Sequence, residues 1–340
     1  MFNRSGIKFL KFVGVVILLG FQPPAFAKAQ EIRVGHFPNV THAPALIARA
    51  RGYFEKEFGN EAAIQWKTFN AGPEAIEALF AGAIDFLYVG PSPAINGYVR
   101  SRGEALRVVA GTAAGGAGLV VRKDSGIEHF EDLKGKRIAT PQKGNTQDVA
   151  LSHLMKEKGL VPKDRGGDVE IFHIAGGDQI ITFLKNQVDA IWTVEPWLTR
   201  LTSEAEGKIL FEESELWPEG KYPTTALVVR KKFIDEKRSL VQKFVAAHVR
   251  LLDWMNGHEA QAKKLFNEEF ARETGKGLPQ DYLDNFFTRI EFTVDPLTAP
   301  FAESARHAEA VGYLGKHQSE ISRLFDLSFL EEAQKGGKTS

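Results

Sequence analysis

Four short polar loops hold the residues of this chain whose types and spacing suit the binding of a ligand. They are Asn39-Val40-Thr41-His42, Gly90-Pro91-Ser92, Lys143-Gly144-Asn145-Thr146 and Thr193-Val194-Glu195-Pro196-Trp197. Each loop precedes a predicted helix, and the unpaired N–H groups at a helix N-terminus bind an oxyanion when hydroxyls and amides lie beside them. Because this arrangement needs no arginine, we interpret the loops as a site for a small anion.

Several of these residues also have a purely structural interpretation. Thr41, Ser92 and Thr146 stand near predicted helix starts, where a hydroxyl side chain caps the helix. His36 and His42 could be hydrogen-bonded groups at a strand end. A metal-binding pair is the alternative for the two histidines, but no third ligand follows at a standard spacing. The sequence leaves both interpretations open.

The loops of the second half raise the same question. Asn145 is either a turn residue or a ligand-binding amide. Glu195 could be an acid favoured by the dipole of the following helix, or it could receive a cationic group such as a substrate amine. Trp197, one residue beyond Pro196, is placed to face a cleft.

Sequence signatures of catalysis are scarce. The stretch Gly90-Pro91-Ser92-Pro93-Ala94 follows a predicted strand as a nucleophile elbow does, but a proline at 93 removes an N–H group that the oxyanion hole needs. The Gly/Ala stretch 111–118 contains no G-x-G-x-x-G and leads into a strand, so it does not indicate a dinucleotide site. Without cysteine there is no thiol nucleophile and no Cys-ligated zinc or iron–sulfur cluster. We therefore expect a binding protein without a cofactor, and not an enzyme.

The charge and length of the chain disfavour nucleic acid as a partner and predict two lobes. The 340 residues carry 43 Lys+Arg and 43 Asp+Glu, whereas a protein that binds nucleic acid normally shows a basic excess or stripe. The chain is also longer than the roughly 250 to 300 residues that one hydrophobic core usually supports.

The first 27 residues have the pattern of a secretory signal peptide. A basic region without acidic residues precedes an apolar run over 12–21, and Ala25-Phe26-Ala27 supplies a small-residue cleavage site. The apolar run is about half the length of a membrane span, which disfavours an uncleaved anchor. Since no cysteine follows that could carry a lipid, we predict a soluble protein of the Gram-negative periplasm, mature from about Lys28.

Strands and helices alternate along the rest of the chain. β-rich runs lie at 31–36, 64–69, 84–89, 106–110, 119–122, 136–140, 169–174 and 188–193, separated by stretches with helical apolar spacing. A further run at 225–233 predicts a strand that can return to the first lobe. This alternation predicts a parallel sheet with helices on its faces. The Gly/Ala stretch 111–118 interrupts it, and we place a first crossover between two lobes there and a second near Pro223. The predicted lobes are 31–120 with 224–335, and 121–223.

The two predicted lobes echo one another. The segments Ala75–Pro91 and Ile180–Pro196 share a helix, a short turn, an aspartate, a buried strand and a final proline. In open α/β sheets the ligand lies beyond the carboxyl ends of the strands. We therefore expect the four polar loops, two from each lobe, to meet in one cleft.

At these loops the chain resembles the periplasmic solute-binding proteins of ABC transporters, specifically the aliphatic sulfonate, taurine and nitrate family. The matching stretches are VGHFPNVTHAPALIARARGYFE, TFNAGPEAIEALFAGAIDFLYVGPSPAIN, DLKGKRIATPQKGNTQDVAL and VDAIWTVEPW. The resemblance covers nearly the whole mature chain. It implies a type II periplasmic-binding-protein fold, in which two α/β lobes with a central cleft and two hinge crossovers close on a ligand. It also implies a monomer that delivers a sulfonate-like anion to a membrane permease driven by an ATPase.

The resemblance further implies a set of ligand-binding positions. The loops of the family map to Asn39, Thr41 and His42, to Gly90 and Ser92, to Asn145 and Thr146, and to Glu195. Many relatives have tyrosine where this chain has His36, and we include His36 and Trp197 among the candidates. Two alternatives stand beside transport. An enzyme of the thiamine-pyrimidine type is disfavoured by the lack of cysteine and by the signal peptide, and a sensory binding protein would report its ligand to a membrane receptor.

Overall fold

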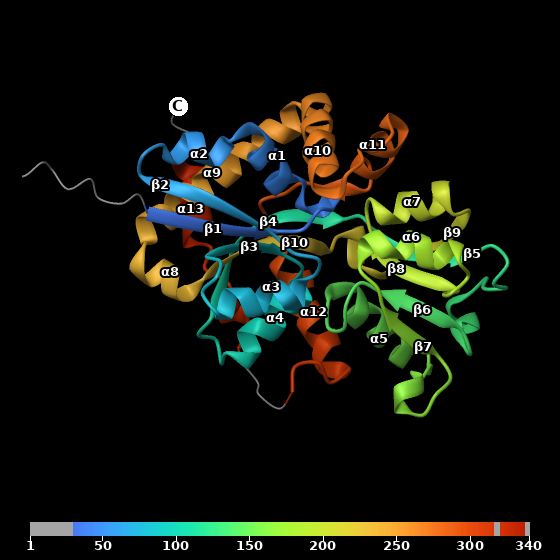
Figure 1. Ribbon diagram of the computed structural model, residues 1–340. Coiled ribbons are helices and arrows are strands. Elements are labelled where there is room, and N and C mark those ends of the chain that lie inside the picture. Colours follow the sequence, from blue (N-terminus) through green and yellow to red (C-terminus); the bar gives the residue numbers. More distant parts are fainter. Residues whose placement is uncertain (1–29, 316–319, 337–340) are drawn as a thin grey trace, which may run out of the picture.

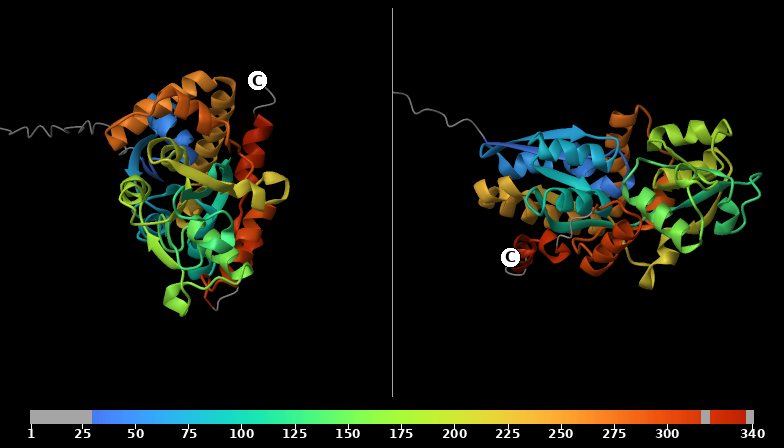
Figure 2. Two further views of the ribbon diagram at one scale, coloured as in Figure 1. Left: turned by 90° about the vertical axis from the view of Figure 1, so that its right-hand side faces the viewer. Right: turned by 90° about the horizontal axis from the view of Figure 1, so that it is seen from below.

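The computed structural model describes residues 30–315 and 320–336, so the predicted signal peptide at 1–27 lies outside the described residues. The described chain forms two β-sheets, each covered by helices, which make two lobes (Figure 1). We call the lobe with the larger sheet the first lobe and the other the second lobe. Seen from below, the second lobe lies beside the first, in green and yellow (Figure 2). Within the described ranges no helix is both long and apolar enough to cross a membrane.

The first lobe is built on a six-stranded mixed sheet. Its strand order is β11 (Ile290–Glu291), β4 (Leu106–Gly115), β10 (Pro223–Arg230), β3 (Phe86–Val89), β1 (Gln30–His36) and β2 (Ala62–Thr68). Strands β1, β2 and β3 run parallel, whereas β10 is antiparallel to both of its neighbours. The carboxyl ends of β1 and β3 therefore lie at the same edge of this sheet.

The second lobe is built on a five-stranded mixed sheet. Its strand order is β7 (Glu170–His173), β6 (Arg137–Thr140), β8 (Ala190–Val194), β5 (Ala117–Arg122) and β9 (Gly207–Glu212). Strands β6, β7 and β8 are parallel, and β5 is antiparallel to β8 and β9. The carboxyl ends of β6 and β8 again share one edge.

The alternation of strands and helices predicts a parallel sheet, but both sheets of the structure are mixed. Strands β5 and β10 enter their sheets directly from the other lobe, without the helical crossover that joins parallel neighbours. Strands β9 and β11 are absent from the predicted set, and β4 continues to Gly115 through the stretch interpreted as an interruption. A Cβ on Gly111 would lie 2.1 Å from the carbonyl oxygen of Asp295. The small residues of β4 therefore let another segment approach the strand.

Helices cover both faces of each sheet (Figure 1). In the first lobe they are α1 (Ala43–Arg51), α2 (Tyr53–Phe58), α3 (Gly72–Phe80), α4 (Pro91–Arg100), α8 (Lys231–Glu236), α9 (Arg238–Gly257), α10 (Glu259–Thr274), α11 (Gln280–Phe287), α12 (Thr298–Ala310) and α13 (Ser328–Gly336). In the second lobe they are α5 (Thr146–Glu157), α6 (Gly176–Leu184) and α7 (Trp197–Glu204). Successive residues of a strand point to opposite faces. Accordingly, Phe86 and Tyr88 of β3 belong to a core with α1 and α9, and Leu87 and Val89 to a core with α3, α4 and α12.

The chain passes between the lobes twice. Strand β4 ends at Gly115 and β5 begins at Ala117 in the other sheet, and the chain returns between β9 and β10. Gly115 and Gly116 have φ values of 80° and 78°, which glycine adopts without strain. A Cβ would also lie 2.5 Å from the carbonyl oxygen of Arg289 at the first position and 2.4 Å from Ile290 at the second. The first crossover therefore requires both glycines.

The same ion pair occurs in each lobe. Asp85 accepts hydrogen bonds from the backbone N–H, Nε and Nη2 of Arg33, at 3.1, 2.8 and 2.8 Å. Asp189 accepts from the same three groups of Arg137, at 2.9, 3.1 and 2.8 Å. Each pair spans 52 residues and joins parallel neighbours, β1 with β3 and β6 with β8. The echo in the sequence is therefore a structural repeat with equivalent strand ends.

A buried histidine joins α9 to the first sheet. The Nε2–H group of His248 donates to the carbonyl oxygen of Gly111 at 2.9 Å, and its Nδ1 accepts from the hydroxyl of Tyr88 at 3.1 Å. Burial lowers the pKa of His248 to about 4, from an ordinary value of 6.5, although the bond to Gly111 acts in the opposite direction. The folded protein thus holds this histidine in its neutral form.

This histidine predicts a dependence of stability on pH. Because the pKa of His248 is lower in the folded than in the unfolded chain, unfolding takes up a proton between about pH 4 and pH 6.5. The contribution is fully present above pH 6.5 and is lost as the pH falls toward 4, by about 3 kcal/mol in total. Urea unfolding across this range should show a smaller slope of unfolding free energy against pH for His248→Gln, and an unchanged slope would contradict this assignment.

Candidate functional site

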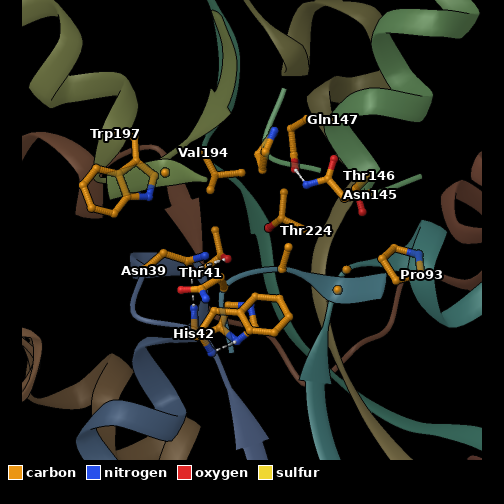
Figure 3. Close-up of a pocket in the computed structure, with 17 residues that line it drawn as sticks. Asn39, Thr41, His42, Pro93, Asn145, Thr146, Gln147, Val194, Trp197 and Thr224 are labelled. Atoms are coloured by element: carbon orange, nitrogen blue, oxygen red, sulfur yellow. Dashed lines mark hydrogen bonds between the residues drawn. The ribbon is translucent and has the colours of Figure 1, made fainter. Parts of the chain in front are cut away.

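A cavity lies between the two lobes, beyond the carboxyl ends of β1, β3, β6 and β8 (Figure 3). It encloses about 530 Å³ that protein atoms do not fill, including its open mouth. Its walls come from both lobes. The lining residues are Phe37, Asn39, Thr41, His42, Asn70, Ala71, Gly72, Gly90, Pro93, Pro141, Asn145, Thr146, Gln147, Gly176, Val194, Trp197 and Thr224.

Six helices begin at the cavity wall. The N-cap residues of α1, α4 and α5 line the cavity, as do the first residues of α3, α5, α6 and α7. The N–H groups of a first helical turn have no partner within the helix, and the helix dipole makes this end positive. Helix starts from both lobes therefore direct N–H groups and the positive ends of their dipoles toward the cavity.

No lining side chain in the described part of the chain is a carboxylate, an ammonium or a guanidinium. The remaining titratable group is His42, whose Nδ1 accepts from the backbone N–H of Phe37 at 3.3 Å. Burial, together with the nearby His36, lowers the pKa of His42 well below its ordinary value of 6.5. Its single proton is therefore on Nε2, which makes this atom a neutral hydrogen-bond donor.

In the first lobe a chain of hydrogen bonds occupies the acceptor of Asn39. Its Oδ1 accepts from the Thr41 hydroxyl at 2.9 Å and from the backbone N–H of His42 at 3.3 Å. The Thr41 hydroxyl in turn accepts from Thr225 at 2.9 Å. The side-chain hydrogen bonds of Asn39 within the described chain all involve Oδ1, which leaves its Nδ2 donor available at the cavity.

In the second lobe the acceptor atom of Asn145, at the start of α5, is also occupied by a protein N–H group. The Oδ1 of Asn145 accepts from the backbone N–H of Asp148 at 3.0 Å, and its Nδ2 donates to the Oε1 of Gln147 at 3.1 Å. The Thr146 hydroxyl is enclosed and has no hydrogen-bond partner among the described residues. Most side-chain acceptors at the wall are therefore occupied, whereas several donors are not.

A buried carboxylate holds the loop that precedes α5. Asp148 accepts from the Thr140 hydroxyl at 3.0 Å, from the backbone N–H of Gly144 at 2.8 Å and from Nε2 of His173 at 3.1 Å. Tyr313 of the first lobe donates to the same carboxylate. Burial raises the pKa of Asp148, but the bonds from His173, Gly144 and Tyr313 outweigh it and hold this pKa below its ordinary value. The carboxylate is fully engaged and does not line the cavity.

The structure brings seven of the ten predicted residues together at the cavity: Asn39, Thr41, His42, Gly90, Asn145, Thr146 and Trp197. The other three do not line it. His36 is fully buried, and its Nε2 lies 2.7 Å from Oε1 of Glu273 in α10. Ser92 is 2% exposed in the first turn of α4.

Glu195, the third, is bound by other residues of the protein. Its Oε2 accepts from the backbone N–H of Thr199 at 2.9 Å, and its Oε1 accepts from the hydroxyl of Thr199 at 2.9 Å. Nη1 of Arg289, from the first lobe, donates to Oε1 at 3.0 Å. Burial raises the pKa of Glu195, whereas the bonds from Thr199 and Arg289 act in the opposite direction. Of its two sequence interpretations, the contacts favour the acid at a helix start.

Several lining residues are absent from the sequence prediction. Thr224 lies on the returning strand β10, whose place beside β3 depends on the second crossover. Gly72 and Gly176 begin the equivalent helices α3 and α6, so an alignment of the two lobes would have found them. A Cβ on Gly72 would lie 2.3 Å from Pro93, and one on Gly176 would lie 2.1 Å from Nε1 of Trp197. Both glycines let the next helix start approach the cavity.

Among residues 30–315 and 320–336, no group of three or more His, Cys, Asp or Glu side chains could hold a metal ion. Figure 3 shows the wall as amides, hydroxyls and rings, with the indole of Trp197 opposite Pro93. The described site therefore has the chemistry of a hydrogen-bonding cavity with apolar surfaces.

The chain is similar in sequence to a known family and to several named proteins. Residues 26–267 match the NMT1-like family. A protein of Bacillus subtilis (strain 168) named "Putative aliphatic sulfonates-binding protein" is 28% identical over 318 residues, which are 91% of this chain and 90% of that protein. The taurine-binding periplasmic protein of Escherichia coli (strain K12) is 28% identical over 222 residues, 65% of this chain and 66% of that protein.

Solved structures share the architecture. The alkanesulfonate-binding protein of Xanthomonas axonopodis pv. citri, solved bound to MOPS, is similar with a TM-score of 0.73 at 22% identity. The similarity covers 88% of this chain and 99% of that one. It confirms the predicted α/β fold of two lobes, the type II periplasmic-binding-protein fold.

Proposed function

The chain belongs to the NMT1-like family, and from this premise we propose that it is the periplasmic ligand-binding subunit of an ABC importer for aliphatic sulfonates or a related small organic anion. Similar proteins are named for binding aliphatic sulfonates and taurine. In this role the protein closes on its ligand and delivers it, as a monomer, to a permease driven by an ATPase. The chain reaches the periplasm through the signal peptide at 1–27.

One observation carries the proposal, namely the excess of free donors at the cavity. The acceptor atoms of Asn39, His42 and Asn145 are occupied by protein N–H and O–H groups. No hydrogen bond within the described chain engages Nδ2 of Asn39 or Nε2 of His42, and the hydroxyl of Thr146 has no partner there. A ligand that only accepts hydrogen bonds, such as a sulfonate or another oxyanion, satisfies these donors without meeting an acceptor.

The same wall supports binding rather than catalysis. A hydroxyl nucleophile needs a base within hydrogen-bond reach. The Nδ1 acceptor of His42 already receives the N–H of Phe37, and the Thr41 hydroxyl donates to Asn39. The Thr146 hydroxyl has no base as a partner among the described residues. We propose that these groups hold a ligand by hydrogen bonds alone.

Calorimetry of the mature protein tests the proposal. We expect ethanesulfonate or 1-propanesulfonate to bind more tightly than roughly millimolar, which corresponds to about 4 kcal/mol, and more tightly than sulfate or nitrate. If neither sulfonate does so, the protein does not serve this ligand class. Sodium chloride at matched ionic strength provides the control for a nonspecific effect of salt.

A close contact between the lobes supports closure on the ligand. The Cα of Gly90 in the first lobe lies so near to Thr146 in the second that a Cβ on Gly90 would be 2.4 Å from the threonine hydroxyl. Gly90 has φ −67° and ψ 160°, which alanine also adopts without strain. An alanine at position 90 therefore obstructs the contact between the lobes and not the folding of either lobe.

We expect Gly90→Ala to weaken the binding of the best sulfonate by roughly ten- to a hundredfold, because relieving an overpacked contact costs about 1 to 3 kcal/mol. Adding Thr146→Ala should restore affinity to that of Thr146→Ala alone, since the Cβ of residue 146 would be 3.5 Å away. Gly177→Ala is the matched control, because a Cβ there meets nothing within 4 Å. Failure of the double variant to recover would argue against a clash between the lobes.

A further inference from the structure

The cavity also restricts which sulfonate it accepts. We infer that the site selects sulfonates whose far end is uncharged and rejects aminoalkanesulfonates such as taurine. The inference rests on the proposed function and concerns the group at the other end of the ligand. Three features support it: the nearby carboxylates are bound by other residues of the protein, side-chain acceptor atoms at the cavity are already hydrogen-bonded, and apolar side chains line the rest of the wall.

The carboxylates nearest to the cavity are committed to the protein. Glu195 directly follows Val194, which lines the cavity, but its two oxygens bind Thr199 and Arg289 and its side chain is 0% exposed. Asp148, in the first turn of α5, accepts four hydrogen bonds and its side chain is 1% exposed. Neither carboxylate is available to form an ion pair with a ligand ammonium.

The acceptor atoms of Asn39, His42 and Asn145 are committed in the same way. An ammonium group has three donors and no acceptor. At this wall it would meet the donor groups of Asn39 and His42, and the positive ends of the helices. A buried cation without partners is strongly disfavoured. The groups that favour the sulfonate end of a ligand therefore disfavour an ammonium at its other end.

The rest of the wall suits an aliphatic chain. Apolar side chains from both lobes line the cavity, namely Phe37, Ala71, Pro93, Pro141, Val194 and Trp197. Trp197 is 7% exposed and packs toward Phe270, with ring centroids 6.3 Å apart, so its position is fixed. Burying a methyl or methylene group against this surface contributes about 0.8 kcal/mol per carbon.

The test compares two ligands of the same size and sulfonate charge. 1-Propanesulfonate and taurine differ only in a methyl group replaced by an ammonium. We expect calorimetry at neutral pH to give an affinity for taurine roughly a hundredfold weaker than that for 1-propanesulfonate. Isethionate, with a neutral hydroxyl at the same position, should lie between them, because its oxygen can accept from the free donors.

The outcomes separate the inference from the proposed function. If 1-propanesulfonate binds and taurine binds within tenfold of it, or more tightly, the inference is overturned while sulfonate binding stands. If no sulfonate binds, the proposed function fails instead. Glu195→Gln adds an independent measure, because a carboxylate that received the amine would lose taurine selectively on this change. We expect the ratio of the two affinities to stay within threefold in that variant.

Discussion

Asn39→Asp is expected to abolish measurable sulfonate binding while the protein stays folded. The Oδ1 position of residue 39 receives the Thr41 hydroxyl and the N–H of His42, and a carboxylate oxygen accepts both bonds equally well. The other position changes from an N–H donor at the cavity to a negatively charged oxygen. Two like charges about 4 Å apart at an effective dielectric constant of 20 repel by about 4 kcal/mol. The affinity should therefore fall by roughly a thousandfold.

Calorimetry with 1-propanesulfonate measures this loss, and thermal unfolding reports the fold. Asn60→Asp, at an exposed position, is the matched control, because it adds the same charge away from the cavity. We expect it to leave affinity within twofold. If Asn39→Asp binds as tightly as the unmodified protein, the Nδ2 group of Asn39 does not face the ligand, and His42 remains as the proposed side-chain donor of the first lobe.

The sequence predicts the positions of Asn39, Thr41 and His42 because they directly follow a strand and precede a helix. Seven of the ten candidates line the cavity for this reason. The sequence does not predict which polar atoms are already hydrogen-bonded to other residues of the protein and which remain available to a ligand. Glu195 stands at the predicted strand end, yet its carboxylate is occupied by Arg289, which lies far along the chain. A contact at that separation depends on how the two lobes pack.

For the fold as well, local sequence patterns predict single elements, whereas strand direction and pairing depend on contacts between distant residues. Apolar spacing predicts α3 over the residues after Pro73 and β3 near Phe86, since both patterns are local. The direction of β10 could not be predicted in this way, because it is set by the route of the chain out of the second lobe. No local pattern distinguishes an antiparallel strand from a parallel one that is buried on both faces. The two-residue strand β11 is likewise recognised only by its pairing with β4.

The repeated ion pair gives the largest expected effect on stability. Asp85 is fully buried and accepts from Nη2 of Arg230 at 2.8 Å, besides its three bonds from Arg33. Its counterpart Asp189 has a side chain that is 18% exposed, and within the described chain it forms an ion pair with Arg137 alone. Removing one partner of a buried pair leaves the other charge uncompensated. The same substitution should therefore cost more in the first lobe than in the second.

We expect Asp85→Ala to lower the free energy of unfolding by about 3 to 5 kcal/mol, and Asp189→Ala by about 1 to 2 kcal/mol. Urea unfolding of both variants, followed in parallel by tryptophan fluorescence and circular dichroism, measures the difference. Because the two aspartates hold equivalent strand pairs, each serves as the control for the other. Equal losses would mean that the strand contact itself, and not the burial of the carboxylate with two arginines, determines the cost. A larger loss for Asp189→Ala would contradict the assignment of Asp85 as the more deeply buried charge.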